Sequence, residues 1–259
     1  MKYKIIFFDI DGTIYSHQSK SIPESTIKSL KELKEKGYII CIASGRSKKL
    51  TSLTGIFNYI DFDYLVLTNG TLVEDKQGHI IYSAPLDKDA INTLLDIVNK
   101  HHLNVTFVNK NDYYLFNDNY ALAHLGYDPL SIALPSISQY QKENIYQINL
   151  FCEDKYLPLF NSCFDVLEFS RLQDFGYDVY TKNHNKSVGI KALLQYLNIS
   201  PSEAIAFGDG HNDKEMIEYV DLGIAMGNAI DKVKNAANYV TSDIDNDGIY
   251  NALKHFNII

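Results

Sequence analysis

Two aspartates near the start of the chain are the residues best placed to carry out chemistry. Asp9 and Asp11 directly follow an apolar run at residues 5–8 and are followed by Gly-Thr. Side chains two residues apart in extended backbone point the same way, so both carboxylates face one side. Such charges repel each other unless one is protonated or a cation lies between them. The spacing therefore predicts a divalent metal site where a buried strand ends.

Two later apolar segments end in polar residues as well. Residues 38–43 lead into Ser44-Gly45-Arg46, and residues 204–207 lead into a cluster with Asp209, Asn212 and Asp213. In open α/β sheets, ligands bind at the carboxyl ends of the strands, so we expect these clusters to converge. Magnesium is a hard ion that prefers oxygen ligands. Copper or zinc would favour His or Cys, and neither gathers at these strand ends. The sequence therefore favours magnesium.

The carboxylates and polar side chains at these strand ends suit phosphoryl transfer. A carboxylate can act as the nucleophile, a cation lowers the repulsion between two anions, and a second carboxyl can protonate the leaving oxygen. Ser44, Asn212 and Lys186 could donate to the transferring oxygens. Simpler interpretations remain open at this point: Ser44 as a helix cap, Lys186 as a solvated surface lysine, and Asn212-Asp213 as a turn and cap.

Composition limits the class of protein. The chain has 259 residues and a net charge of −8, which argues against a nucleic-acid surface. Three scattered cysteines without a C-x-x-C pair are typical of a reducing compartment. The apolar run at residues 5–8 is too short for a signal peptide. Apolar stretches also fall short of the roughly 20 residues of a membrane span. We expect a cytoplasmic protein that binds neither nucleic acid nor membranes.

The order of elements predicts an α/β fold with a doubly wound, mainly parallel sheet, a Rossmann-like core, and an inserted α+β cap domain. Strands at 38–43, 64–67 and 204–207 alternate with helices, as in a parallel sheet. The block between them differs, with a helix at 87–100 and strands that suggest antiparallel pairing. We predict a core at 1–82 and 183–259 and a cap at 83–182. Within the cap we expect short helices at 120–125 and 157–160 and a loop with Pro129 and Pro135.

Four motifs resemble those of a known family. They are residues 9–13 (Asp-Ile-Asp-Gly-Thr), residues 43–46 (Ala-Ser-Gly-Arg), Lys186, and residues 208–213 (Gly-Asp-Gly-His-Asn-Asp). Together they are similar to the motifs of haloacid dehalogenase-like phosphatases, and best to the Cof-type branch with a class IIB cap. The resemblance covers nearly the whole chain. Ser47 stands where the family often has Pro, and Thr71 stands where Ala is usual.

The resemblance implies a role for each position. Asp9 would be the nucleophile and a Mg²⁺ ligand, and Asp11 the general acid and base with its backbone carbonyl on the metal. Lys186 would orient Asp9 and the phosphate. Two further groups follow by the same likeness: phosphate-binding Ser44, Gly45 and Asn212, and metal-binding Asp209 and Asp213. The cap would close over the substrate and exclude water.

These observations predict a Mg²⁺-dependent phosphatase, a phosphoric monoester hydrolase. It would act on a small phosphorylated metabolite, such as a sugar phosphate, through an aspartyl-phosphate intermediate. A phosphomutase or phosphotransferase using the same intermediate is the first alternative, and a non-catalytic sugar-phosphate-binding protein is the second. We expect a monomer or a weak homo-oligomer. The cap residues that would select the metabolite follow no rule that one sequence reveals.

Overall fold

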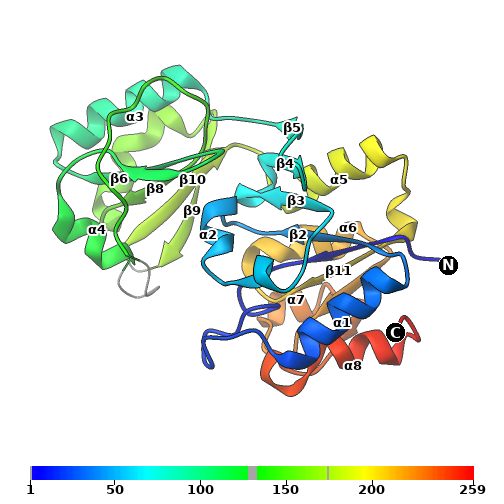
Figure 1. Cartoon of the computed structure of the whole chain (residues 1–259). Coiled ribbons are helices and arrows are strands. Elements are labelled where there is room, and N and C mark those ends of the chain that lie inside the picture. Colours follow the sequence, from blue (N-terminus) through cyan, green and yellow to red (C-terminus); the bar gives the residue numbers. More distant parts are fainter. Residues whose placement is uncertain (1, 128–132, 174) are drawn as a thin grey trace. The chain divides into compact units, whose positions relative to one another are not determined.

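The structure is a computed structural model that describes residues 2–127, 133–173 and 175–259 (Figure 1). The chain divides into two compact units. One comprises Met1–Ser83 with Asn185–Ile259, and the other comprises Ala84–His184. The predicted loop around Pro129 lies outside the described residues.

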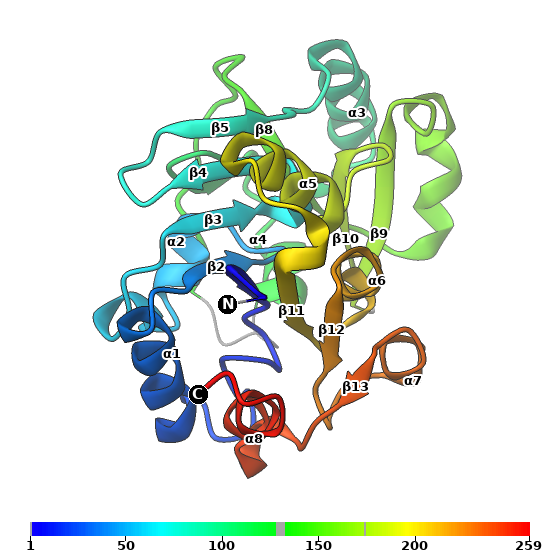
Figure 2. The same ribbon diagram turned by 90° about the vertical axis from the view of Figure 1, so that its right-hand side faces the viewer.

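The first unit is built on an eight-stranded sheet with the order β13-β12-β11-β1-β2-β3-β4-β5 (Figure 2). The strands from β13 to β3 in this order pair in parallel, and β4 and β5 are added antiparallel. The strand bounds are β1 Ile5–Phe8, β2 Ile39–Ala43, β3 Tyr64–Leu67, β4 Leu72–Asp75, β5 Ile80–Ser83, β11 Ala204–Gly208, β12 Leu222–Ala225 and β13 Tyr239–Val240.

Helices cover both faces of this sheet (Figure 2). Ile5 and Phe7 of β1 pack with side chains of α5, α6 and α7. The alternate residues, Ile6 and Phe8, are equally buried and point to the other face, on the side of α1 and α8. The helices are α1 Glu24–Glu35, α2 Lys48–Ser52, α5 Lys186–Leu197, α6 Lys214–Tyr219, α7 Asp231–Lys234 and α8 Gly248–His255, with 3₁₀ turns η1 Ile56–Asn58, η2 Thr68–Gly70, η5 Pro201–Glu203, η6 His211–Asp213 and η7 Ile244–Asn246.

Helix α5 begins at a well-defined cap. The side chain of Asn185 accepts hydrogen bonds from the backbone N–H groups of Ser187 and Val188, which satisfies donors that the first turn leaves free. The helix ends at Asn198, whose φ of 54° is left-handed. This cap makes Lys186 the first residue of the helix.

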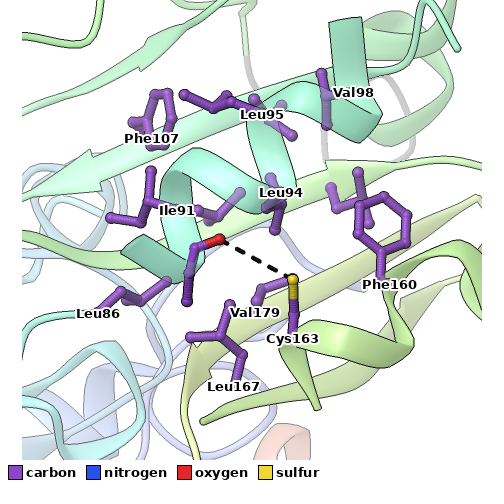
Figure 3. Close-up of a cluster of buried hydrophobic side chains, with 14 of the residues drawn as sticks. Leu86, Ile91, Leu94, Leu95, Val98, Phe107, Phe160, Cys163, Leu167 and Val179 are labelled. Atoms are coloured by element: carbon purple, nitrogen blue, oxygen red, sulfur yellow. Dashed lines mark hydrogen bonds between the residues drawn. The ribbon is translucent and has the colours of Figure 1, made fainter. Parts of the chain in front are cut away.

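The second unit holds a five-stranded antiparallel sheet with the order β7-β6-β8-β10-β9. Residues of α3 and of the 3₁₀ helix η4 pack on one face, where they form an apolar core with β6, β8 and β10 (Figure 3). Helix α4 contacts β6 and β8. The bounds are α3 Lys88–Lys100, β6 Asn104–Asn109, β7 Tyr113–Leu115, α4 Tyr120–Tyr127, β8 Ile145–Phe151, η4 Asp154–Cys163, β9 Leu167–Gln173 and β10 Gly176–Thr181.

The predicted fold class is confirmed: a doubly wound, mainly parallel α/β sheet interrupted by an inserted α+β unit. The short helix expected at 157–160 is longer than predicted and of 3₁₀ type. Pro158 lies inside it and lacks the backbone N–H that an α-helix would use there. Within the described residues, no helix combines the length and apolar character that a membrane span requires.

Candidate active site

The carboxyl edge of the first sheet brings the predicted strand ends together. The order of strands reverses at β1, which pairs with β11 on one side and β2 on the other. Phe8 lies opposite both Phe207 and Ile42, and the N–H of Asp9 donates to the carbonyl of Phe207 at 3.0 Å. The residues that follow these three strands therefore meet at one point of strand reversal, where open α/β sheets bind ligands.

Lys186 lies at the centre of this site and is fully buried. Its Nζ donates to Oδ1 of Asp9 at 2.5 Å and to Oδ1 of Asp213 at 2.6 Å. Burial acts to lower the pKa of Lys186, but the charges of Asp213 and Asp9 outweigh it and raise the pKa above its usual value. The interpretation of Lys186 as a solvated surface residue is therefore wrong, because α5 directs its first side chain into the sheet edge.

Three carboxylates surround the lysine. One oxygen from each of Asp9, Asp209 and Asp213 lies within 4.8 Å of the others. The second oxygen of Asp213 accepts from the backbone N–H groups of Asp209 and Gly210, both at 2.9 Å. Thr13 Oγ1 donates to Asp209 Oδ1 at 2.9 Å. These contacts hold the acidic side chains in fixed positions, and among the residues that the structure describes, Lys186 is the one fully buried cation beside them.

The electrostatics of this triad suit a divalent cation. Burial and the charge of Asp213 raise the pKa of Asp9 well above its usual value. The same two causes raise the pKa of Asp209 to about 7. A bound cation would favour the ionised forms of both. Carboxylate oxygens are the ligands that magnesium prefers, so the donor set fits Mg²⁺.

Gly12 allows the first strand end to approach Asp209 closely. Its φ of 78° is left-handed, a region that non-glycine residues rarely adopt. A Cβ at this position would lie 2.2 Å from Oδ2 of Asp209. The glycine of the D-x-D-G-T string is therefore required both for its backbone conformation and for the space it leaves.

Asp11 is held apart from the three other carboxylates by two basic residues. Arg46 donates to both of its oxygens at 2.7 Å, and His17 Nε2 lies 2.8 Å from Oδ1. Burial acts to raise the pKa of Asp11, but the hydrogen bonds from His17 and Arg46 outweigh it and hold the pKa below its usual range. In this conformation, Asp11 is an ionised carboxylate, and both of its oxygens are hydrogen-bonded to Arg46.

The predicted phosphate-binding residues follow β2 and β11 at the same edge of the sheet. Ser44 is buried, and its Oγ accepts from the N–H of Arg46 at 3.1 Å. The N-cap of α2 is Ser47, so the interpretation of Ser44 as the cap of that helix is wrong. Asn212 Nδ2 donates to Oδ1 of Asn69 at 2.9 Å. A Cβ at Gly45 would lie 3.1 Å from Oδ1 of Asn69 and 3.4 Å from that Asn212 nitrogen, so the glycine leaves room for this pair of amides.

Four residues at this edge were not predicted as site residues. Each of them forms a side-chain hydrogen bond to a predicted site residue. They are Thr13, His17, Arg46 and Asn69. The sequence did contain a signal for Asn69, because it follows a third apolar strand in Thr68-Asn69-Gly70. Asn69 is buried, and its N–H donates to the carbonyl of Ser44 at 3.1 Å, which places it at the same sheet edge. His17 carries no comparable signal, since only the folded loop brings it back to Asp11.

The comparisons with known proteins agree with this fold. The family of haloacid dehalogenase-like hydrolases matches residues 6–253, which is nearly the whole chain. The protein therefore belongs to the haloacid dehalogenase-like hydrolases, and the predicted family is confirmed.

Several relatives match along their full length. YkrA of Bacillus subtilis, provisionally named as a phosphatase, is 35% identical over 265 residues and covers 100% of both chains. A second B. subtilis protein, named as a 5-amino-6-(5-phospho-D-ribitylamino)uracil phosphatase, is 26% identical and covers 97% of each chain. A Geobacillus kaustophilus structure has a TM-score of 0.93 at 32% identity and covers 99% of this chain and 100% of its own. A structure described as a subclass IIB sugar phosphatase has a TM-score of 0.83 at 30% identity, with coverage of 99% and 100%.

Proposed function

We propose that this protein is a Mg²⁺-dependent phosphatase that hydrolyses a small phosphorylated metabolite, such as a sugar phosphate, through an aspartyl phosphate on Asp9. The family and the phosphatase names of the relatives support the predicted enzyme class, a phosphoric monoester hydrolase. The observation that carries the proposal is the buried lysine between Asp9 and Asp213. A lysine placed there opposes the effects of burial and of Asp213 on the pKa of Asp9 and orients its carboxylate, and together with a bound cation it would favour the ionised form that a nucleophile requires.

In the first step, a carboxylate oxygen of Asp9 attacks phosphorus and the bond from phosphorus to the leaving oxygen breaks. Lys186 stabilises the ionised Asp9, and Ser44, Gly45 and Asn212 bind the phosphoryl oxygens. Asp11 gives its proton to the leaving oxygen. Because Arg46 holds Asp11 as a carboxylate, Asp11 must turn away from Arg46 and take up a proton from solvent before it can protonate the leaving oxygen.

In the second step, water attacks phosphorus of the aspartyl phosphate. Asp11, now a carboxylate, takes a proton from the water, and the bond from phosphorus to Asp9 breaks. Inorganic phosphate leaves, Asp9 returns as a carboxylate, and Asp11 is protonated again. When Asp11 pairs with Arg46 again, its low pKa releases that proton to solvent, which balances the proton taken up before the first step.

The metal would be held by Asp9, Asp209 and Asp213, with the backbone carbonyl of Asp11 added by analogy with the family. When bound, Mg²⁺ would reduce the repulsion between the anionic nucleophile and the anionic phosphate. The second unit, Ala84–His184, would act as the cap and select the leaving group. The similar sugar phosphatase and the ribityl chain in the name of the second B. subtilis relative support a hydroxylated substrate.

A screen of phosphorylated metabolites tests this proposal. Phosphate release is measured from sugar phosphates and from 4-nitrophenyl phosphate, with Mg²⁺ and with excess chelator. We expect turnover that requires the metal and delivers the phosphoryl group to water. Full turnover in metal-free buffer would refute the metal's role, while transfer to a second hydroxyl would indicate a mutase or phosphotransferase. Binding of sugar phosphates without turnover would indicate a non-catalytic binding protein.

The proposal includes a cellular setting and an assembly state. All three cysteines are buried and free, as is usual for proteins of a reducing compartment. We place the protein in the cytoplasm as a monomer or weak homo-oligomer. Gel filtration at two concentrations tests the assembly state.

A further inference from the structure

One short turn at the edge of the first sheet has an unusual backbone. Thr68, Asn69 and Gly70 of η2 have φ values of 48°, 54° and 87°, so three successive residues are left-handed. Glycine adopts this conformation freely and asparagine tolerates it, but a β-branched residue such as Thr68 rarely does. Strain of this kind persists only where the surrounding structure holds it, and it is common at functional sites.

A pair of hydroxyl groups closes the turn. The buried side chain of Thr71 donates to the backbone carbonyl of Thr68 at 2.9 Å, and its Oγ1 lies 2.7 Å from Oγ1 of Thr68. Because the proton of Thr71 goes to the carbonyl, the hydroxyl of Thr68 donates to Thr71. These two bonds, which we name the threonine clasp, tie the strained first residue of the turn to the residue that follows it.

The turn supports the loop that follows β2. The backbone N–H of Thr68 donates to the carbonyl of Arg46, and that of Asn69 donates to the carbonyl of Ser44, both at 3.1 Å. These bonds extend the contact between β2 and β3 beyond the last paired residues of the two strands. They hold the backbone on both sides of Gly45, so the turn fixes the segment with two of the proposed phosphate-binding residues, Ser44 and Gly45.

The same turn contacts the two other segments that carry groups for the phosphate. The side chain of Asn69 accepts a hydrogen bond from Asn212 Nδ2 at 2.9 Å. Gly70 packs closely against the start of α5, because a Cβ on it would lie 2.2 Å from the carbonyl oxygen of Asn185. Asn185 caps the helix whose first residue is Lys186. Three segments far apart in the sequence therefore meet at η2.

We propose that η2, held by the threonine clasp, is the positioning element of the phosphate site. The proposal rests on the function proposed above. The turn acts through the groups that it contacts: it fixes the loop after β2, the amide of Asn212 and the start of α5 relative to one another. Donors that are held in place before the reaction bind the transferring oxygens without reorganising. These groups bind the phosphoryl group, so loosening the turn should weaken all phosphate esters by the same factor.

Thr71→Val provides the cleanest test, because valine keeps the shape of threonine and removes only the hydroxyl. Phosphate release is measured with Mg²⁺ from 4-nitrophenyl phosphate and from the best sugar phosphate of the screen. We expect kcat/KM to fall about tenfold for both esters, and the inhibition constant of inorganic phosphate to rise by a similar factor. Thr71→Ser keeps the hydroxyl and should recover to within twofold of the wild type.

Thr51→Val is the matched control. Thr51 is as buried as Thr71, and among the residues that the structure describes, its hydroxyl has no hydrogen-bond partner. This variant should leave kcat/KM and the inhibition constant of inorganic phosphate within twofold. Circular dichroism checks that every variant is folded under the assay conditions.

A double variant shows whether Thr71 acts through the turn. Asn69→Ala alone removes the acceptor of Asn212. If the threonine clasp acts by holding Asn69, the loss in kcat/KM for Thr71→Val with Asn69→Ala should be smaller than the product of the two single losses. A loss equal to that product would show that Thr71 acts independently of Asn69, which would overturn the inference.

Other results would also overturn it. An unchanged kcat/KM in Thr71→Val, a fall of equal size in Thr51→Val, or a fall for only one of the two esters would exclude a positioning role. If Thr71→Val does not fold, Thr71→Ala, with the residue usual in the family, is judged by the same criteria. If the wild type hydrolyses neither ester, the proposed function fails. Calorimetric binding of inorganic phosphate with Mg²⁺ then decides: weaker binding by the Thr71 variant supports the role of η2, whereas equal affinity, or no binding by the wild type, refutes it.

Discussion

Replacing Lys186 by methionine should destabilise the protein as well as inactivate it. Lys186 is fully buried and bonds Asp9 and Asp213 at 2.5 and 2.6 Å. Methionine fills similar space but leaves two buried carboxylates without their counter-charge. Breaking a buried ion pair in this way costs about 3–5 kcal/mol. For chains of this size, that corresponds to a fall of about 6–20 °C in Tm.

Urea unfolding of the wild type and the variant, without added metal, measures this loss. Lys191→Met is the matched control, because Lys191 is exposed on the same helix, and it should change the free energy of unfolding by less than about 0.5 kcal/mol. Adding Asp213→Asn to Lys186→Met removes one of the unpaired charges and should restore part of the lost stability. A loss below about 1 kcal/mol, or no recovery in the double variant, would contradict the electrostatic reasoning.

Three further predictions concern other residues. Asp178 has a pKa of about 6 in the folded chain against a reference of 3.8, so its ionisation disfavours folding increasingly from about pH 4 to 6. The free energy of unfolding of Asp178→Asn, measured with urea and relative to the wild type, should therefore rise by up to about 3 kcal/mol between pH 4 and pH 7. A difference between variant and wild type that does not change with pH would refute this. Asn69→Ala should raise KM for phosphate esters by about tenfold, because Asn212 loses the acceptor that orients its amide. A KM equal to that of the wild type would show that Asn69 does not position Asn212. Asp11→Asn should slow the first step about 10²–10⁴-fold for a sugar phosphate but less for 4-nitrophenyl phosphate, whose leaving group needs little protonation; equal slowing in single-turnover assays would contradict the role of Asp11 as an acid.

The fold was predictable because its signals are local. The runs at β1, β2, β3 and β11 are continuous apolar segments, as buried parallel strands require. A polar residue directly follows each of these strands, so the position of the site at one sheet edge followed from the strands. The helix start at Lys186 also followed from the sequence, because Asn185 is a strong N-cap residue.

The contacts that determine charge and protonation were not predictable in the same way. The burial of Lys186 depends on how α5 packs against the sheet, and a lone lysine gives no sign of it. The pairing of Arg46 with Asp11 joins residues 35 apart in the chain. The left-handed φ of Asn69 arises from the η2 turn. The burial of Lys186 and the pairing of Arg46 with Asp11 depend on long-range packing, for which residue type and spacing provide no signal.

The central claim is that Asp9 becomes phosphorylated. The most direct measurement uses Asp11→Asn, in which the second step should be slow, mixed with 4-nitrophenyl phosphate and Mg²⁺ and quenched in acid. Mass spectrometry of the digested protein should find one phosphoryl group, on the peptide that contains Asp9, and none when Asp9→Asn is added. Phosphate release by Asp9→Asn at the wild-type rate, or a phosphoryl group on any other residue, would contradict the account.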